Sequence, residues 1–427
     1  METTAPAAQQ KIRSVFRFLG PGLVTGAADD DPSGIATYSQ AGAQFGFGLL
    51  WTVVLTWPFM VAVQLISARI GRVTGHGIAA NIKQTMPRPV LIGLVSLLLL
   101  ANIINIAADI AAMGEALQLV IGGSKLVYAM AFGLTGVMLQ VFIPYRSYAP
   151  ILKWSTLALF SYVATAFTVQ IDWRAALAAA FFPSFSANAD YLLVVVAVFG
   201  TTISPYLFFW QASQEVEEMA LRGRVPLREL LSGGGRAIDR IAIDTTFGML
   251  FSNVVAFFII VTTAATLNAH GLKDIQTSAQ AAEALRPLAG QLTFLLFALG
   301  IVGTGMLAVP VLAGSAAYGL AEALGWRSSL EDTPRQARGF YAIIAVATLI
   351  GVGLTFTPLD PIKMLFWSAV INGVISVPMI VAMMLLVSNT GLMQRFAIPR
   401  VLKVTGWTAA GIMFLVLVAL CWSIFRP

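Results

Sequence analysis

The sequence contains few cysteines, histidines and charged side chains. The single cysteine, Cys421, excludes an internal disulfide and a metal cluster built from several cysteines. Charged residues make up 11% of the chain, whereas a soluble domain has about 25%. The glycine triplet Gly233–Gly235 is not followed by the Lys and Ser/Thr of a P-loop, and no other Walker signature occurs. These shortages argue against a soluble protein and against an ATP-driven pump.

The chain is instead rich in apolar residues, which account for 58% of it and give a mean hydropathy of +0.82. A helix of about 20 apolar residues crosses a bilayer. The stretches that match this pattern lie at about 20–45, 48–70, 90–118, 125–144, 148–171, 188–219, 243–266, 290–322, 339–357, 362–388 and 405–425. We therefore expect an all-α, multi-pass membrane protein with about eleven transmembrane helices, embedded in the lipid bilayer of a bacterial inner or plasma membrane.

The lysines and arginines predict the orientation of these spans. Basic residues favour the cytoplasmic side of a membrane protein. With the N-terminus in the cytoplasm and the C-terminus outside, 20 of the 26 basic residues fall on the cytoplasmic side. The longest cytoplasmic connection is the arginine-rich segment Leu221–Arg240. This topology explains the net charge of +6, so a nucleic-acid partner is not expected.

The remaining segments are assigned by composition. Residues 1–19 are expected to form a cytoplasmic tail, because Met1–Gln10 lacks the cationic start of a signal peptide. Residues 389–427 are expected to form a loop and the eleventh helix. The segment 268–286 alternates polar and apolar positions, which predicts a short external amphipathic helix.

The most informative motif is Asp29–Gly34, which places three aspartates, a proline and a glycine inside the first apolar stretch. A carboxylate at bilayer depth costs about 2.5–3.5 kcal/mol, so it normally faces a partner or a watery cavity. Pro32 removes a backbone donor, and Gly34 makes unwinding easier. An interrupted helix that carries negative charge in the middle of the membrane is typical of a cation site.

A second interruption lies in the sixth stretch, where Gly200 and Pro205 flank small polar residues. The first ten spans divide into two five-helix halves, at about 20–171 and 188–388, and the two interruptions then occupy corresponding positions. An odd number of spans in each half makes the halves inverted repeats, and paired broken helices in such repeats mark a transporter's central site. A plain proline kink is the alternative for Pro205 and for Pro378.

Gly20-Pro21-Gly22 followed by Asp31–Gly34 resembles the first helix of the NRAMP family of divalent metal transporters, and Gly200–Gln211 resembles its sixth helix. The resemblance implies two inverted five-helix repeats with broken helices 1 and 6, as in LeuT-like transporters, and metal import by alternating access. It also implies that the protein is not an enzyme and needs no cofactor, the metal being its substrate.

The same resemblance suggests a metal site when it is applied position by position. The family's metal-binding aspartate falls on Asp31, and its asparagine partner falls on Gly34. The residue whose carbonyl binds metal falls on Thr201, and the metal-selecting methionine falls on Ser204. Soft thioethers favour transition metals, whereas carboxylate, carbonyl, hydroxyl and water suit Mg²⁺ and Mn²⁺. The pattern therefore looks closest to the NRAMP-related magnesium transporter branch.

The family's proton-transfer residues are also replaced. Its sixth-helix histidines fall on Tyr206 and Gln211, and its D-L-A-E pattern reads Asp109–Ala112, which retains the aspartate and loses the glutamate. An earlier acidic position of that helix falls on Asn102. Histidine is the side chain best suited to a proton relay near neutral pH. We therefore expect entry without the family's proton coupling, driven by the membrane potential.

Several further polar residues are candidates, each with an alternative role. Asp30 either adds charge to the metal site or pairs with another helix. Asp109, Asn102 and Asn105 share one helix face, where they either line a water path or form interhelical hydrogen bonds. Asn372 is a candidate for completing the ligand shell.

The function expected from the sequence is uptake of divalent metal cations, Mg²⁺ or Mn²⁺, by alternating access. One alternative is a proton-coupled Mn²⁺/Fe²⁺ importer. Another is a Na⁺-coupled symporter of a small solute on the same fold, but three aspartates would repel a substrate carboxylate. A protease dyad of Asp31 and Asp109 is disfavoured, because the glycine-flanked second aspartate is missing.

Overall fold

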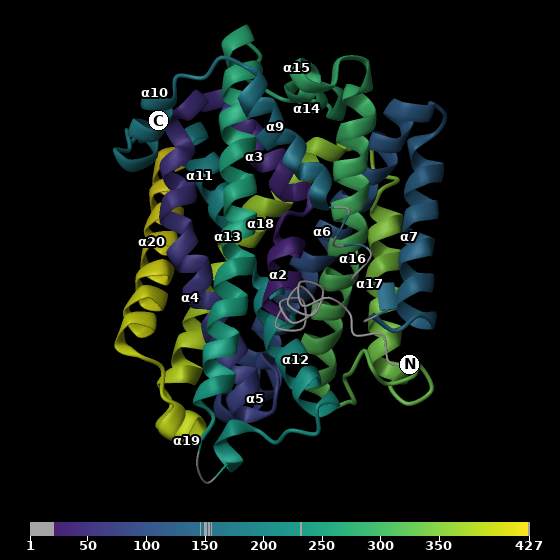
Figure 1. Ribbon diagram of the computed structural model, residues 1–427. Helices are drawn as coiled ribbons and strands as arrows, with labels where there is room; N and C mark the ends of the chain where they lie inside the picture. Colours follow the sequence, from purple (N-terminus) through teal and green to yellow (C-terminus); the bar gives the residue numbers. More distant parts are fainter. Residues whose placement is uncertain are drawn as a thin grey trace, which may run out of the picture.

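The protein is described by a computed structural model that covers residues 21–145, 147, 148, 152, 154, 156–230 and 233–425. These residues form α-helices and short 3-10 helices, and no β-strand occurs among them (Figure 1). The predicted tail 1–19 and Gly20 of the first motif lie outside the described residues. Within the described residues, each of the eleven apolar stretches coincides with a helix or a broken helix, as predicted.

The first half of the chain contains five spans. They are formed by α2 (Pro21–Asp29) with α3 (Pro32–Phe45), α4 (Leu50–Thr74), α6 (Arg88–Ile121), α7 (Lys125–Phe142), and α9 (Phe160–Thr168) with the 3-10 turn Thr156–Leu159. Their connections include the 3-10 turn Gly46–Leu49 and the short helices α5 (Ile78–Thr85) and α10 (Trp173–Phe181).

The second half repeats this order. Its spans are α11 (Ala189–Thr202) with α12 (Pro205–Leu221), α13 (Gly235–Thr266), α16 (Thr293–Leu324), α17 (Arg338–Leu354) and α18 (Pro361–Ser388). The short helices α14 (Ser278–Ala282), α15 (Arg286–Ala289) and α19 (Thr390–Met393) connect them or follow them, and α20 (Arg400–Phe425) is the eleventh span.

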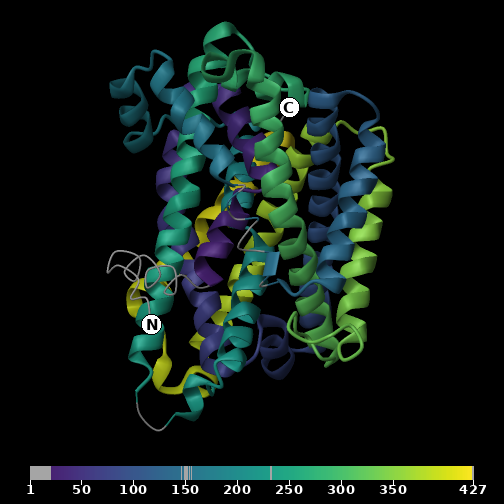
Figure 2. The ribbon, with the colours of Figure 1, turned by 45° about the vertical axis from the view of Figure 1, so that its right-hand side comes forward.

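The lengths of these helices fit a bilayer. Eight helical runs among the described residues are long and apolar enough to cross one, and the first, Pro32–Thr74, joins α3 to α4. Two shorter apolar runs, Thr156–Thr168 and Arg338–Leu354, complete the set. The long helices lie side by side, with α10, α14 and α15 at one end and α5 and α19 at the other (Figures 1 and 2).

The helix packing has the pattern of two inverted repeats. The second span of each half packs against the broken helix of the other half: α4 contacts α12, and α13 contacts α2 and α3. The two third spans, α6 and α16, pack against each other. Inverted repeats that are related by an axis in the membrane plane have such reciprocal contacts. The all-α, LeuT-like fold class predicted from the sequence is therefore confirmed.

Both broken helices are interrupted by the same local chemistry. Asp31 (ψ 169°) and Ser204 (ψ 132°) are extended residues, each followed by a proline at the first position of the next helix. A proline disfavours helical conformation in the residue before it, and its fixed φ suits the first turn of a new helix. By contrast, α18 continues through Pro378.

The amphipathic helix predicted over 268–286 is confirmed only in the second half of that segment. Gly271 adopts a left-handed φ of 82° that ends the turn Asn268–His270, and the chain then has no regular secondary structure as far as Thr277. The helix α14 begins only where Thr277 and Gln280 form a capping box. The alternating polarity of this segment therefore belongs to a turn and a short helix.

Candidate functional site

The Asp31 carboxylate lies between α2 and α3 and accepts hydrogen bonds from three elements. Its Oδ1 accepts from Ser33 Oγ at 2.6 Å and from the Gly34 N–H at 2.8 Å. Its Oδ2 accepts from Asn105 Nδ2 of α6 at 3.0 Å and from the Tyr206 hydroxyl of α12 at 3.4 Å. These four donors fix the position of the buried carboxylate where both broken helices meet.

The second interruption approaches this carboxylate through Ser33. Ser204 Oγ donates to the carbonyls of Gly200 and Thr201, each at 2.8 Å. Thr201 Oγ1 lies 3.5 Å from Ser33 Oγ, which itself donates to Asp31. Because the Ser204 proton is used on carbonyl groups, the lone pairs of its oxygen remain available to a cation or a coordinated water.

Gly34 brings α3 close to α11. A Cβ atom at this position would lie 3.4 Å from the Tyr38 ring and 3.3 Å from Thr201 Oγ1, which is tighter than ordinary van der Waals contact. Glycine therefore permits this close approach of Thr201, and it supplies no side-chain oxygen to the site.

The three predicted residues of α6 have different partners. Asn105 donates to Asp31, and its Oδ1 accepts from Ser368 of α18 at 2.7 Å. Asn102 donates instead to the Leu312 carbonyl of α16 at 3.0 Å. Asp109 is buried, and neither of its carboxylate oxygens has a hydrogen-bond partner among the described residues. The structure therefore joins only Asn105 directly to Asp31.

Asn372 of α18 is buried one turn beyond Ser368. Its Nδ2 has no hydrogen-bond partner within the described part of the chain. Its carbonyl accepts from Ser376, whose hydroxyl also donates to the Ile203 carbonyl at the second interruption. Asn372 therefore lies on the helix that supports both interruptions, and among the described residues no hydrogen bond joins it to Asp31 or Ser204.

Asp29 and Asp30 face α13 rather than Asp31. Ser252 Oγ of α13 lies 2.5 Å from Asp29 Oδ2 and 3.0 Å from Asp30 Oδ1. The other carboxylate oxygen of each aspartate is buried and has no hydrogen-bond partner among the residues described. In the described part of the chain, no three His, Cys, Asp or Glu side chains converge as a metal cluster. A cation beside Asp31 would thus be held by one carboxylate, neutral oxygens and water.

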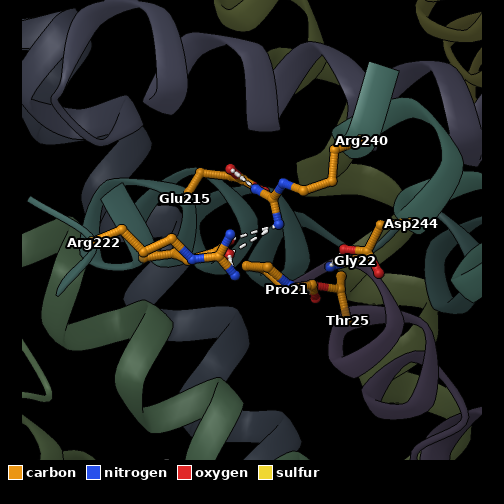
Figure 3. Close-up of polar contacts among 8 residues, drawn as sticks. Pro21, Gly22, Thr25, Glu215, Arg222, Arg240 and Asp244 are labelled. Carbon is orange, nitrogen blue, oxygen red and sulfur yellow. Dashed lines mark hydrogen bonds and ion pairs between the residues drawn. The ribbon is translucent and has the colours of Figure 1, made fainter. Parts of the chain in front are cut away.

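The end of the molecule that carries the predicted cytoplasmic arginines is closed around α2. The Gly22 N–H donates to Asp244 of α13 at 2.8 Å (Figure 3), and Thr25 donates to Gln211 of α12. A Cβ on Gly26 would lie 2.2 Å from the Gly248 carbonyl oxygen. This contact was not predicted from the sequence, although Gly22 and Gly26 have the small-residue spacing that allows close helix packing.

The opposite end is hollowed. A cavity of about 370 Å³ is bordered by α3, α11, α18 and the segment 274–276, with Gln40, Asp190 and Lys363 among its lining residues. These elements also carry the site around Asp31. Asp31 itself is not among the residues that line this cavity.

Comparison with known proteins identifies the family. The family profile described as "Natural resistance-associated macrophage protein-like" (Nramp) matches residues 22–423. The chain belongs to the Nramp family. A protein named "Divalent metal cation transporter MntH" from Klebsiella pneumoniae strain 342 is 27% identical over 424 residues, covering 97% of this chain and 95% of that relative. One with the same name from Aeromonas hydrophila is 28% identical over 321 residues, covering 72% of each.

Solved structures show the same fold. A mutant of the Eremococcus coleocola manganese transporter superposes with a TM-score of 0.77 at 18% identity, covering 97% of this chain and 88% of that one. Mhp1, a nucleobase-cation-symport-1 family transporter in a closed conformation, gives 0.55 at 14% identity, covering 95% of this chain and 92% of the other. Membership of the Nramp family confirms the predicted resemblance and the prediction of an integral membrane transporter rather than an enzyme.

Proposed function

We propose that this Nramp protein takes up divalent metal cations by alternating access, with Mg²⁺ and Mn²⁺ as its substrates. The observation that carries the proposal is the Asp31 carboxylate, held by four donors at one helix interruption and linked through Ser33 to the Thr201 hydroxyl of the other. Asp31 would be the charged ligand. Thr201 and Ser204 would add oxygens or hold coordinated water.

The ligand chemistry supports hard ions. Neither interruption carries a thioether, thiol or imidazole, and carboxylate, carbonyl and hydroxyl oxygens suit Mg²⁺ and Mn²⁺ better than Cd²⁺. Mg²⁺ binds through one or two carboxylates and retains several waters. A single carboxylate among neutral oxygens meets that requirement.

We further propose that the metal enters without protons. Tyr206 donates to the Ala28 carbonyl at 2.9 Å and to Asp31 at 3.4 Å, and Gln211 accepts from Thr25, so neither position where the family places histidines carries the imidazole of a proton relay. Two charges that cross the membrane gain about 4.6 kcal/mol per 100 mV. The membrane potential would supply this energy directly.

The test is uptake of Mg²⁺, Mn²⁺ and Ca²⁺ into proteoliposomes that contain the full chain. We expect Mg²⁺ and Mn²⁺ influx that Asp31→Ala abolishes. Asp172→Asn is the matched control, because Asp172 is an exposed helix cap and asparagine caps a helix equally well. Influx that survives Asp31→Ala, or no divalent influx in the parent protein, would refute the proposal.

A further inference from the structure

Five arginines line one cavity at the end of the molecule where α2 is closed. The cavity has a volume of about 480 Å³ and lies between the end of α4, the connection from α12 to α13 and the start of α13. Its arginines are Arg72, Arg222, Arg224, Arg236 and Arg240. The other lining residues, including Leu227, Leu230 and Ala237, are apolar or glycine.

The acidic side chains nearby neutralise only part of this charge. Glu218 pairs with Arg222 and Arg240, and Glu215 pairs with Arg240 at 3.1 Å (Figure 3). Among the described residues, no ion pair is formed by Arg72, Arg224 or Arg236. Of the five arginines, only Arg222 and Arg240 therefore form ion pairs among the described residues.

Arg72 is the clearest sign that the cavity needs an anion. It is only 5% exposed, and its Nε has no hydrogen-bond partner in the part of the chain that the structure describes. The Nε of Arg240 is also buried and without a partner there. Burying a cation is costly unless it is paired and hydrogen-bonded. A bound anion would supply both the charge and the acceptors.

The geometry of α13 favours a phosphate group that is attached to an apolar chain. This 32-residue helix begins at Gly235, beside the cavity, and a helix N-terminus attracts anions. Arg236 and Arg240 share a helix face with Ile243 and Phe247, which are both 62% exposed. The arginines of α13 are thus followed, on the same helix face, by exposed apolar side chains of the kind that contact lipid tails.

We infer that this cavity binds the phosphate headgroup of an anionic phospholipid from the adjacent membrane leaflet. The arginines hold the phosphate by charge-assisted hydrogen bonds, for which the guanidinium fork is suited. An acyl chain lies along the exposed apolar face of α13. The inference concerns a surface separate from Asp31 and is independent of which metal is carried.

The test uses the purified full chain in a neutral detergent, with dioleoyl phosphatidylglycerol and dioleoyl phosphatidylcholine as probes and native mass spectrometry as the readout. We expect one tightly held phosphatidylglycerol and weaker phosphatidylcholine binding. Arg224→Gln with Arg236→Gln removes two exposed arginines that lack ion pairs among the described residues. It should weaken phosphatidylglycerol binding about thirtyfold, which is roughly fivefold for each arginine.

The matched control is Arg335→Gln with Arg338→Gln. It makes the same charge change at exposed positions that do not line the cavity, and it should leave binding unchanged. Equal loss in both double variants, or no loss in either, would overturn the inference. In the parent protein alone, displacement of the lipid by millimolar inorganic phosphate would show that the cavity is a site for the free anion and would also overturn it.

Discussion

At the scale of single residues, the Asp31 carboxylate is held by Ser33 and Gly34 of its own motif and by two neighbours on other helices, Asn105 and Tyr206. Asn105 is central among them, because it donates to Asp31 and accepts from Ser368, and so links α3, α6 and α18. Ser204 has a comparable role at the second interruption, where its hydroxyl is fixed by two carbonyls. The site is thus one charged ligand in a frame of neutral hydrogen bonds.

Asn105→Ala should weaken metal affinity. A hydrogen bond to a charged group contributes about 1.5–3 kcal/mol, so its loss should raise the half-saturating concentration of Mn²⁺ by about tenfold or more. Concentration-dependent uptake in proteoliposomes measures the change. Asn102→Ala is the control, since it makes the same substitution on the same helix but removes a bond to the Leu312 carbonyl. An equal effect of both substitutions would contradict the assigned role of Asn105.

Ser204→Met should shift selectivity toward soft ions. The added thioether favours Cd²⁺ over Mg²⁺, so the ratio of Cd²⁺ to Mg²⁺ uptake should rise relative to the parent protein. Ser204→Ala removes the hydroxyl without adding sulfur and should lower the uptake of both ions without that rise. An unchanged ratio in Ser204→Met would show that residue 204 does not face the ion.

At the scale of helices, α2 is held against α12 and α13 by contacts that leave no room for side chains. Asp244 binds the Gly22 N–H at the start of α2, and a Cβ on Gly248 would lie 2.3 Å from the Gly22 carbonyl oxygen. Backbone packing this close cannot adjust to an added methyl group as a flexible side chain does. The glycines are therefore required for the closed arrangement.

Gly248→Ala should open this contact. Cys421→Ser gives a background without cysteine, because Cys421 is the only one in the chain. In that background, Thr25→Cys should resist a membrane-impermeant maleimide, because Thr25 is buried. Adding Gly248→Ala should make it reactive.

Gln336→Cys, at an exposed position, is the labelling control and should react in both backgrounds. Continued protection of Thr25→Cys in the Gly248→Ala protein would contradict the account of the α2 contact.

At the scale of the whole molecule, the features that follow from local sequence were predictable. Hydropathy identified the spans, and a polar residue before Pro32 and Pro205 identified both interruptions, because proline acts on its immediate neighbours. Pairings across the fold were not predictable in this way. Ser252 donates to Asp29 and Asp30, and the Gly22 N–H donates to Asp244. These hydrogen bonds join residues more than 200 positions apart.

The polar face of α6 shows the same limit of prediction within one helix. The spacing placed Asn102, Asn105 and Asp109 on one face, but it did not reveal which neighbouring helix each side chain contacts. Asn102 contacts α16, and Asn105 contacts α3 and α18. The error in the first half of 268–286 arose because a periodic polarity pattern does not reveal where a left-handed glycine such as Gly271 ends a turn.

The most direct test of the central claim is simultaneous measurement of metal influx and internal pH in proteoliposomes under an imposed, inside-negative potential. With Mg²⁺ outside, the account predicts influx that increases with the potential, toward an accumulation of about 2,000-fold per 100 mV. It predicts no acidification that depends on the metal, and no influx with Asp31→Ala. Internal acidification that tracks Mg²⁺ entry, or influx that persists without Asp31, would contradict it.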